Sequence, residues 1–150
     1  MKNNRKKVMI LTNHSYMLYR FRKELIEELM KNYDVVLSMP FVGHHEDFIN
    51  MGLRCIETKM ERRGVNPIHD FSLMKFYKKI LQEENSDLVI TYSIKPNVYG
   101  GLMCEKLNIP FYANVQGLGT AFQKPGLAQF ATVLYKTAFK KVKTVFFENQ

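Results

Sequence analysis

The sequence is poor in the features that define several common classes of protein. It holds only two cysteines, Cys55 and Cys104, which are too far apart in sequence for a disulfide framework or a CxxC metal pair and indicate two buried thiols in a reducing compartment. No apolar run is long enough to cross a membrane. The basic start, "MKNNRKK", is followed by an apolar stretch, Val8 to Leu11, that is too short for a signal peptide. We therefore expect a cytoplasmic protein.

Motifs for nucleotide cofactors are missing as well. A dinucleotide site needs GxGxxG in the first turn, where small residues let a pyrophosphate approach the start of the helix. Here that turn reads "NHSY" (13–16) and contains no glycine. Gly117 and Gly119 form a G-x-G after a later strand but lack the third glycine, and the sequence has no Walker A motif. We expect neither a bound cofactor nor a metal ion.

What the chain has in excess is positive charge. Its 22 basic and 14 acidic residues give a net charge of +8, which favours an anionic partner: nucleic acid, an anionic membrane surface or a phosphorylated substrate. The sequence has no zinc-finger spacing, RNP motif or helix-turn-helix, so nucleic acid is not expected. Basic residues concentrate near both ends, in "NNRKK" and in "YKTAFKKVK" (135–143). These ends predict peripheral, reversible contact with the inner face of the cell membrane.

Short apolar runs alternate with amphipathic segments along the whole chain. A chain of 150 residues forms about one domain. Strands that alternate with helices indicate right-handed crossovers and a parallel sheet covered on both faces, so the pattern predicts an α/β fold, a Rossmann-like doubly wound parallel sheet. Strands are expected at 7–13, 34–39, 53–58, 87–93, 111–115 and 144–149, and helices at 18–31, at 46–52 with Gly52 as the stop, after a cap at Asp70, from Pro96, and at 127–141.

Four loops are candidates for a binding site, because ligands of such sheets lie beyond the carboxyl ends of the strands. In "KMERRGVNP", Arg62 and Arg63 can fork onto phosphate oxygens, and Gly64 permits a tight turn beneath them. Asn66 is held extended before Pro67, so its amide is expected to point out of the turn. A solvated loop is the alternative interpretation for such an arginine pair.

The loop after the fourth strand, "SIKPNVYGG", offers further anion ligands. Lys95 and Asn97 stand at the start of a predicted helix, where unpaired amide hydrogens and the helix dipole favour an anion. Each charge-assisted hydrogen bond contributes about 1.5–3 kcal/mol. The sequence therefore predicts a diphosphate site made by these residues together with Arg62, Arg63 and Asn66, although a solvent-exposed Lys95 is the simpler alternative.

Four segments in this order resemble the amino-terminal half of bacterial glycosyltransferase family 4 enzymes: "YRFRKELIEEL", "ETKMERRGVNPIHD", "TYSIKPNVYGG" and "ANVQGLGTAF". The likeness covers nearly the whole chain and is greatest to enzymes that extend undecaprenyl-diphosphate-linked sugars for capsule, O-antigen or protein glycosylation. It implies a GT-B fold, in which residues 1–150 are the acceptor-binding domain and a second Rossmann-like domain, absent from this chain, binds the nucleotide sugar.

The resemblance also implies which residues line the cleft and an activity for the full-length protein. That activity is retaining transfer of a sugar, from a UDP-linked donor, to a polyprenyl-diphosphate-linked saccharide. The family's paired donor-site glutamates are expected beyond Gln150, and catalytic residues are not identified in this chain. The residues expected to line the cleft are Asn13, His14, Tyr16, Tyr92, Gln116, Gly117 and Gly119.

One position departs from the family pattern. Many members carry a histidine after the fifth strand, where this chain has Gln116, and glutamine cannot act as a base. The remaining histidines do not replace it, because His44 and His45 are expected in a solvent loop and His69 before a helix cap. Only His14, in the exit loop of the first strand, is positioned for chemistry.

The alternative function belongs to another class. The chain could be a stand-alone phosphosugar or sugar-nucleotide binding module, or an epimerase-like domain without transferase activity. An epimerase of that kind would need a glycine-rich first turn and a Tyr-x-x-x-Lys pair, and Tyr19 and Lys23 have that spacing on the first helix. We interpret this spacing as accidental. A gene about twice this length with two close acidic residues late in the chain would favour the transferase.

Overall fold

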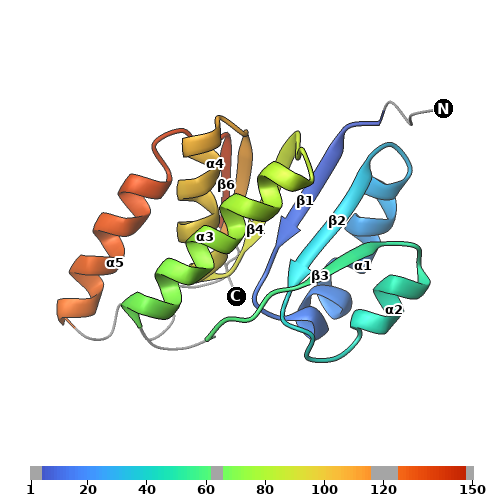
Figure 1. Cartoon of the computed structure of the whole chain (residues 1–150), viewed down its shortest axis with the longest axis horizontal. Helices are drawn as coiled ribbons and strands as arrows, with labels where there is room; N and C mark the ends of the chain where they lie inside the picture. Colours follow the sequence, from blue (N-terminus) through green and yellow to red (C-terminus); the bar gives the residue numbers. More distant parts are fainter. Residues whose placement is uncertain (1–4, 62–65, 116–124, 148–150) are drawn as a thin grey trace.

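The fold is a parallel sheet that alternates with helices, as the sequence predicted. The computed structural model describes residues 5–61, 66–115 and 125–147. Within them, parallel strands form one sheet in the order β3-β2-β1-β4-β5-β6 (Figure 1). The strands are β1 (Lys7–Leu11), β2 (Asp34–Met39), β3 (Arg54–Glu57), β4 (Leu88–Tyr92), β5 (Phe111–Val115) and β6 (Thr144–Phe147).

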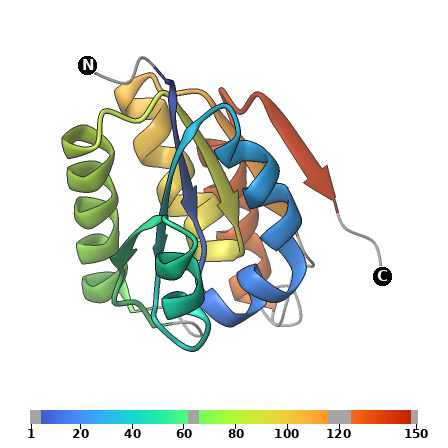
Figure 2. The same cartoon turned by 90° about the vertical axis from the view of Figure 1, so that its right-hand side faces the viewer.

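Helices cover both faces of the sheet (Figures 1 and 2). The chain moves from β1 outward to β3 and then crosses to β4, so right-handed crossovers bring α1 and α2 to one face and the later helices to the other. We name these the α1 face and the α3 face. The helices are α1 (Ser15–Met30), α2 (His45–Asn50), α3 (Pro67–Glu83), the π-type turn η1 (Pro96–Gly100), α4 (Gly101–Leu107) and α5 (Pro125–Ala138).

Each face has its own hydrophobic core. In β1, Val8 and Ile10 point to the α1 face, and Met9 and Leu11 point to the α3 face. All four are fully buried, because a parallel sheet covered by helices leaves neither face to water. This explains why the central strands are continuous apolar runs and why their positions could be predicted within one or two residues.

The starts of α1 and α3 differ most from the prediction. α1 begins at Ser15, three residues early, because the ring nitrogen of His14 accepts a hydrogen bond from the backbone of Met17 and caps the helix. The cap of α3 is Asn66, and the predicted cap, Asp70, is wrong: it is a buried residue inside the helix. The predicted end of α2 at Gly52 is confirmed, since this residue has φ +96°.

The paired glycines after β4 let the chain pack closely on the sheet. A Cβ atom on Gly100 would lie 2.6 Å from Leu11 Cδ1, and one on Gly101 would lie 3.0 Å from the ring of Phe111. Small residues at these two positions therefore let the junction of η1 and α4 pack directly on the side chains of β1 and β5. None of the helices in the described part of the chain combines the length and apolarity that a bilayer crossing requires.

Candidate functional site

The carboxyl ends of β1 and β4 meet where the strand order reverses, which is where ligands of doubly wound sheets bind. The Asn13 Oδ1 atom accepts a hydrogen bond from the Ser93 hydroxyl over 2.8 Å and so joins the two exit loops. Ser93 has φ +79°, an uncommon conformation for a residue other than glycine. The predicted cleft residue Asn13 therefore lies at the switch point, hydrogen-bonded to a residue of the neighbouring loop that has a sterically costly backbone.

A group of stacked rings lies beside this point, at the start of α1. His44 stacks on Tyr19 with ring centroids 4.4 Å apart and lies 5.1 Å from the ring of Tyr16. The His14 and Tyr16 rings meet edge to face at 6.1 Å. The predicted cleft residues His14 and Tyr16 are thus brought together by the structure.

The loop after β2 is anchored to this group, which corrects the prediction that His44 and His45 lie in solvent. The hydroxyl of the buried Ser15 accepts from the backbone of Val42 at 2.8 Å and donates to the carbonyl of Gly43 at 2.7 Å. Both histidines are half-buried: His44 on Tyr19, as above, and His45 flat against Phe41 at 4.5 Å. Sequence spacing gave no sign of the contacts with Ser15 and Tyr19, because these residues lie at least 25 positions before their partners in the loop.

Tyr92, also predicted to line the cleft, is only 3% exposed and packs in the core of the α1 face. The guanidinium of Arg22 lies over its ring at 5.4 Å. Burial raises the pKa of Tyr92, and the nearby Arg22 opposes that rise. The Tyr92 ring is therefore part of the core on the α1 face, with the Arg22 guanidinium above it.

The predicted anion ligand Lys95 is held in a buried ion pair. Its Nζ donates to Asp70 Oδ1 at 2.9 Å, and the two side chains are 11% and 6% exposed. The hydroxyl of Tyr99 donates to the other oxygen of Asp70, also at 2.9 Å. Burial and this hydrogen bond raise the pKa of Tyr99. The cluster of these three residues ties α3 to η1, and sequence reasoning missed it.

Asn97 is likewise engaged within the protein. It is 1% exposed, its Oδ1 accepts from the Thr91 hydroxyl at 2.6 Å, and its Nδ2 donates to the carbonyl of Asn114 at 2.9 Å. The amide thus bridges β4, η1 and β5 beneath the site. In this arrangement both ends of the Asn97 amide are hydrogen-bonded within the protein, and the residue positions the loops.

Asn66 also has a structural partner. Its Oδ1 accepts from the backbone of Ile68 at 3.1 Å and of His69 at 3.3 Å, so the amide oxygen faces the helix rather than pointing out of the turn. The predicted anion ligands Arg62 and Arg63 lie outside the described residues, as do the predicted cleft residues Gln116, Gly117 and Gly119.

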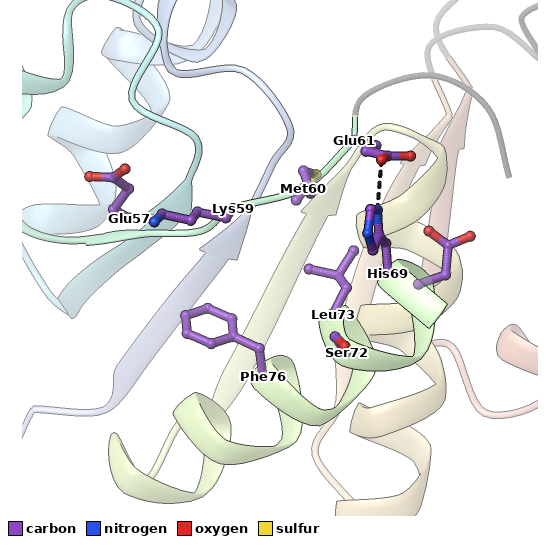
Figure 3. A pocket seen from close by; sticks show the side chains of 9 residues that line it. Glu57, Lys59, Met60, Glu61, His69, Ser72, Leu73 and Phe76 are labelled. Atoms are coloured by element: carbon purple, nitrogen blue, oxygen red, sulfur yellow. Dashed lines mark hydrogen bonds and ion pairs between the residues drawn. The ribbon is translucent and has the colours of Figure 1, made fainter. Parts of the chain in front are cut away.

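A groove of about 830 Å³ opens between α3 and the segment that leaves β3 (Figure 3). At its mouth, His69 Nδ1 and Glu61 Oε1 are 2.6 Å apart. Because Nδ1 is held by the carboxylate, Nε2 is the ring nitrogen that can meet a ligand. The lining residues are Glu57, Lys59, Met60, Glu61, His69, Asp70, Ser72, Leu73 and Phe76.

This groove combines an apolar floor with groups that bind hydroxyls and phosphates. Met60, Leu73 and Phe76 belong to the core of the α3 face or pack against it, while Lys59 and the pair of His69 with Glu61 supply polar contacts. Glu61, the last described residue before segment 62–65, lines the groove, and Asn66, the first described residue after it, caps α3. The described residues contain no cluster of three or more metal-ligating side chains.

Solved structures with this fold include both transferases and epimerases. The chain superposes on MurG of Acinetobacter baumannii with a TM-score of 0.66 at 14% identity, covering 97% of this chain and 41% of MurG. It superposes on the UDP-GlcNAc 2-epimerase of Methanocaldococcus jannaschii with a TM-score of 0.61 at 16% identity, covering 96% and 39%. At these identities the likeness shows the fold alone.

Sequence comparison is more specific. The chain is 26% identical over 151 residues to the N,N'-diacetylbacillosaminyl-diphospho-undecaprenol alpha-1,3-N-acetylgalactosaminyltransferase of Campylobacter jejuni subsp. jejuni serotype O:2, covering 96% of this chain. It spans 40% of the length of that relative. The family model described as "Glycosyl transferase 4-like" matches residues 7–149. The chain therefore belongs to the glycosyl transferase 4-like family.

Proposed function

We propose that this chain is the acceptor-binding half of a retaining glycosyltransferase. The complete enzyme moves a sugar from a nucleotide sugar, UDP-linked, to a saccharide carried on a polyprenyl diphosphate, in the synthesis of capsular or other surface polysaccharide. The observation that carries the proposal is the groove between α3 and the segment that leaves β3, whose lining includes Glu61, the residue that precedes Arg62 in the sequence. Family membership and the lipid-diphosphate-linked sugar in the name of the Campylobacter relative support it.

The groove suits the first sugars of such an acceptor. An apolar floor can pack against a sugar ring, and the carboxylates of Glu57 and Glu61 can accept hydrogen bonds from its hydroxyls. The diphosphate next to that sugar would then lie beside the loop 62–65, where two guanidinium groups can fork onto its oxygens. Since Lys95 and Asn97 are engaged with Asp70 and Asn114, we assign the anion contacts chiefly to the two arginines.

The donor side belongs to a second domain in this proposal. Residues 1–150 bind the acceptor, and a further Rossmann-like domain binds the nucleotide sugar across a cleft lined by Asn13, His14 and Tyr16. The purified 150-residue chain should therefore bind acceptor but turn over no nucleotide sugar. Turnover by this chain alone would overturn that division of labour.

Acceptor binding by the chain itself gives the decisive experiment. A water-soluble short-chain prenyl diphosphate linked to an N-acetylhexosamine is titrated into the wild type and into Arg62→Ala/Arg63→Ala. The double variant should bind at least about tenfold more weakly, as expected for the loss of at least one charge-assisted hydrogen bond. Lys140→Ala/Lys141→Ala is the control for lost positive charge.

The result also separates the transferase from the alternative module. Tighter binding of a free nucleotide sugar than of the prenyl diphosphate would favour a sugar-nucleotide binding or epimerase-like protein. Equal affinity of the Arg62→Ala/Arg63→Ala variant and the wild type for the prenyl diphosphate would remove the arginines from the site.

A further inference from the structure

The outer face of α3 carries two exposed apolar side chains at the ligand edge of the sheet. Ile68 is 76% exposed and Phe71 is 54% exposed, and both lie in the first turns of the helix. Single exposed apolar residues are ordinary on protein surfaces, but neighbours on successive turns at a ligand edge indicate an interaction site. We name Ile68 and Phe71 the apolar pair.

The charges around the apolar pair are positive. Lys75 Nζ lies 4.9 Å from the centre of the Phe71 ring, and Lys79 follows one turn later with its side chain 68% exposed. The acidic Asp70 of this helix is buried against Lys95. Other acidic groups near this helix in the described part of the chain are Glu57 in the groove, Glu61, which pairs with His69, and Glu83, which lies 4.0 Å from Lys79. The outer face of α3 is therefore apolar at its start and basic along its middle.

An apolar stripe on α1 serves as a comparison. Met17, Phe21 and Leu25 are 46%, 53% and 42% exposed at four-residue spacing. The charges of this helix are mixed: Arg20 lies over the Phe21 ring at 5.9 Å, and Glu27 and Glu28 pair with Lys23 and Lys31. An anionic surface would therefore attract this face of α1 less than the outer face of α3.

The basic residues near the chain ends lie at the wrong edge of the sheet for the proposed acceptor. Arg5 and Lys6 precede β1, and Lys140, Lys141 and Lys143 precede β6. These positions are at the amino ends of parallel strands, at the top of the sheet in Figure 1, whereas α3 starts at the carboxyl end (Figure 1). A five-residue strand spans about 16 Å. A membrane in contact with the chain ends would therefore lie at the amino-terminal edge of the sheet, opposite the edge that holds the groove.

We infer that the outer face of α3, with Ile68 and Phe71 inserted among acyl chains and Lys75 and Lys79 at the headgroups, docks this protein on an anionic membrane surface. Long lysine side chains can lie along apolar surface while their ammonium groups stay with phosphates. Two apolar side chains with a few lysines give reversible attachment that salt weakens. The inference rests on the proposed function for its purpose, since it brings a membrane-anchored diphosphate beside the groove and the Arg62–Arg63 segment.

Cosedimentation with vesicles tests this surface without any acceptor. The purified chain is mixed with vesicles of phosphatidylcholine, with and without phosphatidylglycerol, that contain no polyprenyl lipid. We expect binding to the anionic vesicles at low salt, release at high salt, and a loss of at least about tenfold in partitioning for Ile68→Ser/Phe71→Ser. The matched control, Phe21→Ser/Leu25→Ser, removes similarly exposed apolar groups from α1 and should bind like the wild type.

Lysine variants test the charge on α3 against the charge near the chain end. Lys75→Gln/Lys79→Gln should weaken binding and reduce its salt dependence, whereas Lys140→Gln/Lys141→Gln should change it little. Equal losses for the α1 and α3 apolar variants, or loss only with the Lys140 and Lys141 variant, would overturn the proposal. A change of oligomeric state in Ile68→Ser/Phe71→Ser, with unchanged vesicle binding, would show that a second copy occupies this face.

The vesicle-binding result can be interpreted independently of the proposed function. Failure of vesicle binding leaves the binding of the water-soluble prenyl diphosphate unaffected, and failure of diphosphate binding leaves the vesicle result unaffected. Circular dichroism of each variant confirms that the helices are retained, since the substituted side chains are exposed.

Discussion

The two faces of the sheet hold their loops in place by different sets of contacts. On the α1 face, half-buried rings stack on one another, with His44 on Tyr19 and His45 on Phe41, and the Ser15 hydroxyl adds two hydrogen bonds. On the α3 face, a buried ion pair and a buried amide join the elements, through Asp70 with Lys95 and through Asn97. Stacked rings can shift at small cost, but buried charges and amides lose much when one partner is removed. The α3 face therefore makes the rigid wall of the groove.

The largest expected effect comes from breaking the buried ion pair. Asp70→Asn leaves the Lys95 ammonium uncompensated in a pocket where only 11% of its side chain meets water. The free energy of unfolding should fall by about 3–5 kcal/mol, measured by urea denaturation.

A double variant distinguishes pairing from a ligand role. Asp70→Asn/Lys95→Gln removes both charges, keeps a hydrogen-bonded pair, and should recover more than half of the lost stability. Lys79→Gln, on the exposed side of the same helix, should change stability by less than about 0.5 kcal/mol. If Asp70→Asn were as stable as the wild type, the Lys95 ammonium would not need Asp70 for its stability. Lys95 would then again be a candidate ligand for an anion.

A smaller loss is expected from the buried amide. Asn97→Ala leaves the hydroxyl of Thr91, which is fully buried, and the carbonyl of Asn114 without their partner. Unpaired buried groups of this kind cost about 1–3 kcal/mol each, so we expect a loss of about 2–3 kcal/mol. Asn66→Ala is the comparison, since losing an exposed helix cap costs about 1 kcal/mol. Equal losses for the two alanine variants would show that the buried network contributes little.

The stacked rings of the α1 face should tolerate substitution better. Tyr19→Leu keeps an apolar side chain but removes the stacking on His44 and the edge contact with Phe48, at ring distances of 4.4 and 5.3 Å. Aromatic contacts contribute about 0.5–1.5 kcal/mol beyond their buried area, and a loss in that range is expected by urea denaturation. Phe21→Leu, two residues on and exposed, should cost less. A loss for Tyr19→Leu as large as that for Asp70→Asn would make the two faces equivalent.

The sequence predicted the strands well because each central strand is buried on both faces and reads as an unbroken apolar run. The ends of helices were less predictable, because a cap depends on which side chain meets which backbone amide, as for His14 and Asn66. Polar residues of the "SIKPN" loop were interpreted as anion ligands from their position at a helix start. Their partners, Asp70 and Asn114, lie 25 and 17 residues away, and no local pattern shows such a pairing.

The smallest expected effect is a difference in thiol reactivity between the two faces, because one cysteine lies on each face. Cys55 packs beside the core of the α1 face and is half-buried, whereas Cys104 is fully buried in the core of the α3 face. Burial raises the pKa of Cys55 to about 11 and that of Cys104 to about 12. The thiolate is the reactive form, so at pH 8 both should react slowly with iodoacetamide, and Cys104 about tenfold more slowly, as one pKa unit implies.

The raised pKa values of the two thiols determine how stability and cysteine labelling change with pH. A thiol whose pKa is higher in the folded state than in the unfolded state favours folding below the unfolded pKa, and this contribution is lost as the pH rises through the folded value. Native-state labelling of Cys55 should therefore increase first as the pH is raised toward 11, followed by that of Cys104. Mass spectrometry after tryptic digestion resolves the two sites, and the urea-unfolded chain is the control in which both should react alike. Faster labelling of Cys104 than of Cys55 in the native protein would show that the α3 face opens more readily, contrary to its assignment as the rigid wall.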